Sequence, residues 1–149
     1  MIVTAYLRVS KPVRELADKL MVPEKMFLFV RDRVKYEPDP YDRWKLPEET
    51  LRDMAGDCED KAILLASLLI AKDYDAWVRI ARVRRIDGSV VYHAWVVYRL
   101  GLEWIDLDPS CPKCRPGERE FTVIKYILDF NDKLIRVHDP ELAEKFVLR

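Results

Sequence analysis

The sequence predicts an α+β fold in which helices come first and an antiparallel sheet follows. Two observations support this. Up to residue 72, apolar side chains recur at helical spacing, and prolines punctuate the pattern. From residue 76 onward the chain is rich in β-branched and aromatic residues that alternate with polar ones, and turn signals separate the runs. Helices followed by strands are typical of an α+β domain. At 149 residues, the chain is expected to form a single domain over residues 1–149.

Prolines and apolar spacing define the elements of the helical half. Pro12 and Pro23 each open a helix, because proline suits the first helical turn. Pro38 ends the second helix, since the residue before a proline is pushed out of the helical region. The predicted elements are a strand or ordered arm over 2–9, helices over 13–21 and 23–35, a loop over 41–46, a short helix over 47–51 and a main helix over 58–72.

Turn residues divide the second half into strands. Asp87-Gly88 is a strong hairpin signal, and Gly101 marks another tight turn. Asp139-Pro140 caps a final short helix. The predicted elements are strands over 76–86, 90–98, 102–107, 121–130 and 134–137, and a helix over 140–147.

The segment Gly56–Ala62 combines a tight turn, a helix cap and a cysteine. Asp57 is a good N-cap, and Asp60 stands three residues later, where a capping box places its acidic partner. Cys58 then lies in the first helical turn, where the helix dipole and unpaired N–H groups favour a thiolate. Cys58 is therefore a candidate nucleophile. The helix behind it is apolar nearly all round, which predicts a central, buried helix.

The chain has only two histidines, and His93 lies within a predicted strand. By alternation it shares an apolar face with Trp95 and Val97, and this face is expected to pack on the central helix. Trp95, like Trp104, is expected to belong to the core or to a pocket wall. The other histidine, His138, precedes Asp139-Pro140 and is expected to be structural or on the surface.

The hairpin after His93 places a carboxylate beside it. With Leu100-Gly101 as the turn, Trp95 pairs with Asp106 and His93 with Asp108. Asp108 is preferred over Asp106 as the acid that orients His93. Cys58, His93 and Asp108 then form a candidate nucleophile, base and acid.

Three ordered blocks resemble the transglutaminase-like superfamily. They are Gly56-Asp57-Cys58-Glu59-Asp60-Lys61-Ala62, Tyr92-His93-Ala94-Trp95-Val96 and Trp104-Ile105-Asp106-Leu107-Asp108-Pro109-Ser110. The resemblance implies a papain-like fold, with the cysteine helix packed on an antiparallel sheet that carries the histidine and the aspartate. It also implies Cys58, His93 and Asp108 as a catalytic triad, with no cofactor required. The chain is close in size to the bare core of that superfamily, which favours hydrolysis over regulated cross-linking.

The sequence offers three candidate donors for the stabilisation of an oxyanion. The backbone N–H of Cys58 is one candidate. The chain contains no glutamine, so the side-chain amide of papain-type enzymes is missing. The indole N–H of Trp44 and the hydroxyl of Tyr36 are the nearest upstream candidates for a second donor.

Cys111 and Cys114 have the spacing of a zinc knuckle, but no second cysteine pair exists in the chain. His138 or a second copy of the chain would have to complete a metal site. A loop disulfide and two free thiols are the alternatives to zinc.

The composition excludes several classes of protein. Twenty-six basic residues balance 26 acidic ones, which argues against a dedicated nucleic-acid binder. No apolar run approaches a membrane span, and the first ten residues lack the features of a signal peptide. We therefore expect a cytoplasmic protein that acts on a peptide or protein amide. High charge with one asparagine and no glutamine is typical of a thermophile. The oligomeric state is not predicted.

Three functions follow from these patterns. The first is a cysteine-dependent amide hydrolase, a peptidase or amidase, or an acyl transferase that passes through a thioester. The second is a non-catalytic module that uses the papain-like groove to bind a peptide or protein. The third is a metal-stabilised assembly protein built on Cys111 and Cys114.

Overall fold

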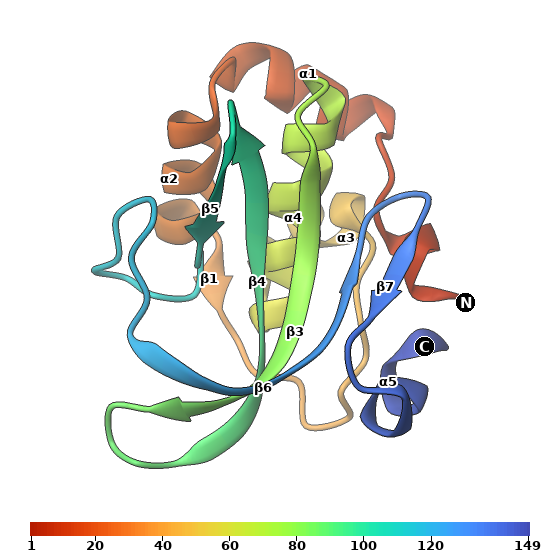
Figure 1. The fold of residues 1–149 in the computed structure, drawn as a ribbon. Helices are drawn as coiled ribbons and strands as arrows, with labels where there is room; N and C mark the ends of the chain where they lie inside the picture. The colour runs from red at the N-terminus through yellow and green to blue at the C-terminus, as the bar shows by residue number, and fades with distance from the viewer.

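The computed structural model describes residues 1–149, with helices packed against one face of an antiparallel sheet (Figure 1). The helices are η1 (Val3–Tyr6, a 3₁₀ helix), α1 (Lys11–Leu20), α2 (Pro23–Arg33), α3 (Pro47–Asp53), α4 (Cys58–Ala71) and α5 (Pro140–Val147). The strands are β1 (Lys35–Tyr36), β2 (Ala55–Gly56), β3 (Ala76–Arg85), β4 (Val90–Leu100), β5 (Glu103–Leu107), β6 (Phe121–Phe130) and β7 (Ile135–Val137). No helix has the length and apolar character needed to cross a membrane.

The main sheet has five strands in the order β5-β4-β3-β6-β7, and each neighbouring pair is antiparallel. Strands β1 and β2 form a separate parallel pair close to the start of α4. Helix α4 packs on β3 and β4, while α1, α2 and α3 pack around its other sides. The predicted α+β fold, with the cysteine helix against an antiparallel sheet, is confirmed.

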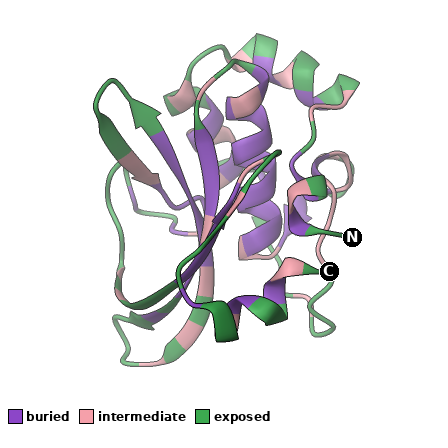
Figure 2. Ribbon diagram, turned by 45° about the vertical axis from the view of Figure 1, so that its right-hand side comes forward, coloured by how far each residue is buried: buried purple, intermediate pink, exposed green.

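Helix α4 lies at the centre of the main core. Twelve of its 14 residues are buried, and it is coloured as buried along most of its length in Figure 2. Its apolar residues contact those of the surrounding helices and of the inner face of the sheet. The prediction of a central buried helix is confirmed, because a helix that is apolar all round is stable only when it is covered on every side.

The start of α4 is fixed by the capping residues that the sequence indicated. Asp57 is the N-cap, and its own N–H donates to Oδ2 of Asp60 at 3.0 Å. Asp60 also accepts the backbone N–H of Lys45 at 2.8 Å, which ties the preceding loop to the helix. A Cβ atom on Gly56 would lie 2.6 Å from Cβ of Asp60, so only glycine fits beside this cap.

The β4–β5 hairpin has a different register from the predicted one. Its turn residues are Gly101 and Leu102, not Leu100 and Gly101, and Gly101 adopts a positive φ of 63° that suits glycine. Asp106 consequently pairs with Val97, a shift of two residues. A two-residue shift keeps every side chain on its predicted face, because side chains alternate with a period of two.

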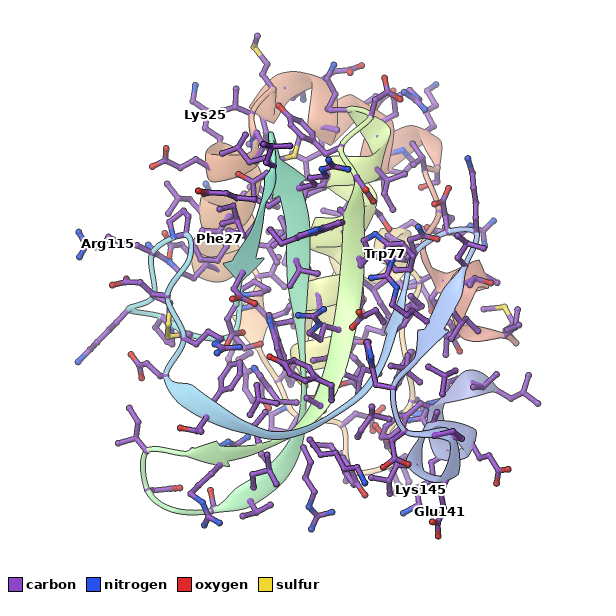
Figure 3. All side chains as sticks on the ribbon, viewed as in Figure 1. Lys25, Phe27, Trp77, Arg115, Glu141 and Lys145 are labelled. Carbon is purple, nitrogen blue, oxygen red and sulfur yellow. A yellow bond between two sulfur atoms is a disulfide. The ribbon has the colours of Figure 1, made fainter.

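The expectation that the His93 face of β4 packs on the central helix is wrong. Ala94, Val96 and Tyr98 face α4, whereas Trp95 and Val97 belong to a second, smaller cluster on the opposite face. Trp77 of β3 belongs to that cluster, and Figure 3 shows it in front of the sheet, away from the helices. Both faces of β4 are apolar, so alternation alone could not decide which one the helix covers.

Of the two alternatives predicted for the first residues, a strand and an ordered arm, the strand is wrong. These residues form η1, and Val3, Tyr6 and Leu7 are buried in the main core. The only β-type contact here is a single antiparallel bridge between Ile2 and Leu148, which brings the two ends of the chain together (Figure 1).

Candidate functional site

Two adjoining pockets lie where the start of α4 meets the sheet. The larger has a volume of about 770 Å³ and contains Asp108 in its wall. The smaller has a volume of about 300 Å³ and contains Cys58. Three residues line both pockets, namely Tyr36, Arg85 and His93. His93 therefore stands at the junction of a single cleft.

The two pockets meet at His93 because the pairing of β5 with β4 ends before it reaches His93. The pairing of these strands ends at Val96 with Leu107, so the edge of β4 beside His93 is free of a neighbouring strand. The chain that continues from β5 reaches this edge from one side, and the start of α4 lies on the other. An edge of this kind allows residues from both faces of the sheet to meet.

His93 and Asp108 are in direct contact. Nε2 of His93 lies 2.9 Å from Oδ2 of Asp108, and the side chains are 11% and 5% exposed. The other carboxylate oxygen accepts the backbone N–H of Ser110 at 3.1 Å. With Nε2–H donating to Asp108, Nδ1 is left as the acceptor nitrogen, and no group of the chain bonds to it. Asp108 lies beyond the end of β5, so the contact is made by side chains rather than by the directly opposed pairing that was predicted.

Asp106 lies elsewhere. Its Oδ1 accepts the indole N–H of Trp95 at 2.8 Å. Asp108 is thus the hydrogen-bond partner of His93, and Asp106 is the hydrogen-bond partner of Trp95. The ring of His93 stacks on Trp95, with centroids 5.9 Å apart, and meets Phe121 edge-on at 5.0 Å. Trp95 is completely buried, as expected for a core residue, whereas Trp104 is 45% exposed.

Cys58 is the only free cysteine of the chain, and it is half-buried. Its Sγ donates to Oε2 of Glu59 at 3.3 Å, and no hydrogen bond joins it to His93. Burial raises the pKa of the Cys58 thiol well above its usual value, and the charges of Glu59 and Asp57 add to this effect. The predicted thiolate is therefore disfavoured in this arrangement, because two carboxylates next to Cys58 oppose the helix dipole.

The backbone N–H of Cys58 is not free to stabilise an oxyanion. It donates to Oδ1 of Asp57 at 2.6 Å. The same oxygen accepts the hydroxyl of Tyr36 at 3.2 Å. The N-cap that fixes the helix start thus also occupies the donor that the sequence suggested.

Tyr36 and Trp44, the other candidate donors, both line the pocket of Cys58. Burial and the neighbouring Cys58 and Asp57 raise the pKa of Tyr36, so its hydroxyl keeps its proton. Trp44 is held by ring contacts to Tyr6 and Phe130, with centroids 5.6 Å and 5.9 Å apart. Its indole N–H has no hydrogen-bond partner in the chain.

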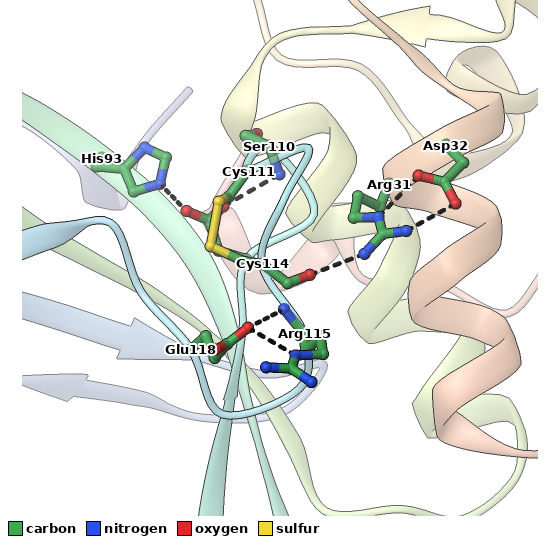
Figure 4. Close-up of a disulfide and its surroundings, with 9 residues drawn as sticks. Arg31, Asp32, His93, Ser110, Cys111, Cys114, Arg115 and Glu118 are labelled. Carbon is green, nitrogen blue, oxygen red and sulfur yellow. Dashed lines mark hydrogen bonds and ion pairs between the residues drawn. A yellow bond between two sulfur atoms is a disulfide. The ribbon is translucent and has the colours of Figure 1, made fainter.

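Cys111 and Cys114 form a disulfide (Figure 4). The disulfide alternative is thus the one in the structure, and disulfide sulfurs offer no thiolate to a zinc ion. The loop closes directly onto the candidate site, because the N–H of Cys111 donates to the backbone oxygen of Asp108 at 3.2 Å. At its other end, the guanidinium of Arg31 donates to the backbone oxygen of Cys114 at 2.9 Å.

This disulfide bears on the predicted cytoplasmic location. Disulfides persist mainly in oxidising compartments, and intracellular proteins of hyperthermophiles are the main exception. A cytoplasmic location therefore fits the disulfide best if the thermophile prediction also holds. Both remain predictions.

Two charged residues of α4 were missed by the sequence reading. Glu59 is buried, and burial with the nearby Asp57 charge raises its pKa to about 8. Its Oε1 has no hydrogen-bond partner. Lys61 is also buried, and its Nζ donates to the backbone oxygen of Val34 at 2.7 Å. Both residues belong to the motif around Cys58. Their charge on an otherwise apolar helix is the sequence signal that would have identified them.

The comparison with protein families decides what kind of protein carries this site. The sequence profile of the transglutaminase-like superfamily matches residues 9–109. The chain belongs to the transglutaminase-like superfamily. Members of this superfamily are typically cysteine peptidases or transferases. The match covers Cys58, His93 and Asp108, and it confirms the resemblance that the three sequence blocks indicated.

Solved structures share the fold. LapG from Legionella pneumophila gives a TM-score of 0.64 at 24% identity, over 88% of this chain and 80% of LapG. Its calcium-bound form gives a TM-score of 0.63 at 23% identity, over 91% of this chain and 83% of LapG. A proposed cysteine protease from Cytophaga hutchinsonii gives 0.60 at 20% identity, over 80% of this chain and 44% of that one. No curated protein matches the sequence significantly.

Proposed function

We propose that the chain is a cysteine-dependent amide hydrolase or acyl transferase that acts on a peptide or protein. Cys58 is the nucleophile, His93 the base and Asp108 the acid that orients His93. The observation that carries the proposal is the His93–Asp108 pair, because His93 lines the same pocket as the only free cysteine. Membership of a superfamily of cysteine peptidases and transferases supports it.

The reaction uses these groups in two stages. Nδ1 of His93 takes the proton of Cys58, and Sγ attacks the carbonyl carbon of the amide. Asp108 accepts from Nε2–H and stabilises the imidazolium that forms. The imidazolium then gives its proton to the leaving amine as the carbon–nitrogen bond breaks, and a thioester remains. Water, or a second amine, gives a proton to His93 and attacks the carbonyl carbon of the thioester. The carbon–sulfur bond then breaks, and the leaving sulfur of Cys58 takes the proton back from His93.

Cys58 is a protonated thiol before the substrate binds, so a base is needed to remove its proton. Because burial and two carboxylates raise the pKa of Cys58, little thiolate exists before the substrate arrives. Substrate binding has to turn Sγ away from Glu59 and toward His93. No cofactor takes part in these steps.

For the oxyanion we propose Trp44 as the donor and Tyr36 as its alternative. The indole N–H of Trp44 is unpaired in the pocket of Cys58, whereas the hydroxyl of Tyr36 already donates to Asp57. Losing one oxyanion donor typically costs about 100-fold to 1,000-fold in kcat. A loss of this size in Trp44→Phe, with a much smaller loss in Tyr36→Phe, would support this choice, and the reverse order would assign the role to Tyr36.

Chemical labelling tests the nucleophile without knowledge of the substrate. Iodoacetamide should alkylate Cys58 in the folded protein, and His93→Ala should slow this reaction. A fluorogenic peptide library, assayed with and without a primary amine, then separates hydrolysis from amine transfer. Cys58→Ala is the matched inactive control. Turnover that survives Cys58→Ala would reject the proposal.

A second candidate function is a non-catalytic peptide-binding module. Cys58 bonds to Glu59 rather than to His93, and its raised pKa suits an inert thiol. This function predicts peptide binding to the cleft without turnover. It also predicts a Cys58 alkylation rate that does not change in His93→Ala.

Calcium is a candidate ligand because one of the LapG structures is calcium-bound. Ligand atoms of Asp57, Cys58 and Glu59 lie within 4.8 Å of one another. Oxygen ligands suit calcium, and the unpartnered buried Oε1 of Glu59 fits such a cation. We propose Asp57 and Glu59 as its ligands. A bound cation would neutralise the two charges that raise the pKa of Cys58. Calorimetric titration with calcium should show binding that Glu59→Gln weakens.

A further inference from the structure

The cleft contains one arginine whose side chain has no partner. The guanidinium of Arg85 forms no ion pair and no hydrogen bond with the rest of the chain, although it lines both pockets. A guanidinium offers five N–H donors in a planar fork that matches a carboxylate. Arginine side chains elsewhere on the same strand do have partners: Arg79 bonds to Asp129, and Arg84 donates to the backbone oxygen of Gly88.

The acidic groups of the cleft are mostly occupied. Asp108 bonds to His93, and Asp87 accepts both the N–H and the hydroxyl of Ser89, at 2.9 Å and 2.6 Å. Asp57 accepts from Tyr36 and from the N–H of Cys58. Asp42 is paired with Arg149. Glu59 accepts from Sγ of Cys58 through Oε2, and its buried Oε1 has no partner. Glu120 lines the larger pocket and has no hydrogen-bond or ion-pair partner. Arg85 is the only arginine or lysine that lines the two pockets.

Arg85 lies beside the reacting groups. It is one of the three residues shared by the two pockets, together with His93 and Tyr36. On the sheet it pairs with Phe121 of β6, whose ring contacts His93. Tyr36, which lines both pockets with Arg85, also lines the smaller pocket with Cys58. A group bound to Arg85 would thus lie near the amide that Cys58 attacks.

We infer that Arg85 is the specificity-determining residue of the cleft, and that it selects substrates with a carboxylate close to the scissile amide. The carboxylate belongs either to an aspartate or glutamate side chain or to the carboxyl terminus of a peptide. This inference rests on the proposed function and adds the substrate class to it. Glu120, at the side of the larger pocket, would disfavour a second negative charge there and so limits the preference to the position that Arg85 reaches.

Peptide binding to the Cys58→Ala protein tests the inference directly. Four fluorescent peptides of one sequence differ only in one glutamate replaced by glutamine and in a free or amidated carboxyl terminus. Fluorescence anisotropy gives the dissociation constant of each. We expect the favoured carboxylate to tighten binding by about 10-fold to 100-fold, the range of a hydrogen bond to a charged group. The pair of peptides that differs most identifies the source of the carboxylate.

Two variants on the Cys58→Ala background separate Arg85 from general charge effects. Arg85→Met should abolish the preference, and Arg85→Glu should reverse it toward a peptide with lysine at that position. Arg84→Met is the matched control, because Arg84 precedes Arg85 on β3, points to the other face of the sheet and lines neither pocket. It should leave the preference unchanged.

Equal binding of all four peptides would overturn the inference, and so would a preference that survives Arg85→Met or disappears in Arg84→Met. The proposed function is tested separately, by turnover in the protein with Cys58 intact. Turnover without any preference for acidic peptides would reject the role of Arg85 and keep the hydrolase. An Arg85-dependent preference without turnover would keep the role of Arg85 and reject the hydrolase.

Discussion

The chain contains two histidine–aspartate pairs on its sheet, and they have nearly the same contact distance. Nε2 of His93 lies 2.9 Å from Asp108, and Nε2 of His138 lies 3.0 Å from Asp129. Both aspartates are buried. By distance and burial alone, either pair would qualify as the base and acid of a cysteine enzyme.

The remaining partners of the two aspartates differ. Asp129 takes two hydrogen bonds from Arg79, at 2.8 Å and 3.1 Å, and Arg136 lies 3.9 Å away. Burial alone would raise the pKa of Asp129, but Arg79 and His138 outweigh it and hold the pKa below its usual value. Asp108 has no arginine partner and accepts only from His93 and from the N–H of Ser110.

This difference separates a structural pair from a functional one. Asp129 is satisfied by arginine, so His138 adds one more donor to an ion cluster that holds β3, β6 and β7 together. Asp108 has His93 as its only side-chain partner, and His93 lines the pocket that contains Cys58. The histidine–aspartate contact becomes informative only when the other groups around the carboxylate are counted.

The largest difference between the two pairs is expected in kcat/KM when each histidine is replaced by alanine. His93→Ala should lower kcat/KM by about 1,000-fold or more, as for other bases of a triad, whereas His138→Ala should leave it close to wild type. Alkylation of Cys58 by iodoacetamide provides a second measurement that needs no substrate. Equal losses in the two variants would remove the distinction between the pairs.

Replacing the aspartates should separate rate from stability. Asp108→Asn should reduce kcat by roughly 100-fold to 10,000-fold with little change in melting temperature, because the carboxylate orients His93 and stabilises its cation. Asp129→Asn should instead lower the free energy of unfolding by about 3–5 kcal/mol, since it leaves Arg79 without its counter-charge. Denaturant unfolding, with kcat measured on the folded fraction, checks both. A stable Asp129→Asn protein with a large loss of rate would contradict the assignment.

The disulfide gives a third difference between the two pairs. Its Cys111 is hydrogen-bonded to the backbone oxygen of Asp108, and Asp129 has no disulfide beside it. The double variant Cys111→Ser, Cys114→Ser should lower kcat by roughly 10-fold if a loosened loop misplaces Asp108. The loop between the cysteines is short, so the loss of stability should be only about 2 kcal/mol. Cys58 is then the only cysteine, which allows the assay to be run with and without dithiothreitol. An unchanged kcat would show that the hydrogen bonds of the loop suffice.

The last contrast concerns Glu59, which is a buried acid without a basic partner, unlike Asp129. Its folded pKa is raised from 4.5 to about 8. Below the lower value both folded and unfolded states hold the proton. As the pH rises, the unfolded state releases it first, so stability falls between about pH 4.5 and 8, by at most about 1.4 kcal/mol per pH unit.

Glu59→Gln should flatten this part of the curve of unfolding free energy against pH. The measurement is a series of urea titrations across the range, with wild type and variant compared at each pH. Parallel curves for the two proteins would show that Glu59 does not carry the pH dependence.

The sequence alone determined the fold class, the central helix and the position of its first residue. These follow from local rules. The N-cap Asp57 and the acid three residues later specify where α4 begins, and an all-apolar helix must be buried. Strand β6 was predicted to its observed ends, 121–130, because turn residues bound it on both sides. Cys58, His93 and Asp108 were all found by sequence motifs, and their catalytic roles stay a proposal.

Tertiary structure decided how these residues meet. The register of the β4–β5 hairpin depends on whether Leu100 or Leu102 is the second turn residue beside Gly101. The two registers differ by two residues and keep every side chain on the same face, so the sequence pattern does not distinguish them. The choice of the face of β4 that covers α4 was equally open, because both faces are apolar.

The electrostatics of the site also required the fold. A cysteine at a helix start favours a thiolate when it faces water, but here burial and the carboxylates of Asp57 and Glu59 reverse that preference. The unpaired state of Arg85 and the arginine partners of Asp129 depend on residues up to 50 positions apart in the chain. Local sequence sets which groups are present, and only the packed structure sets which of them are left without a partner.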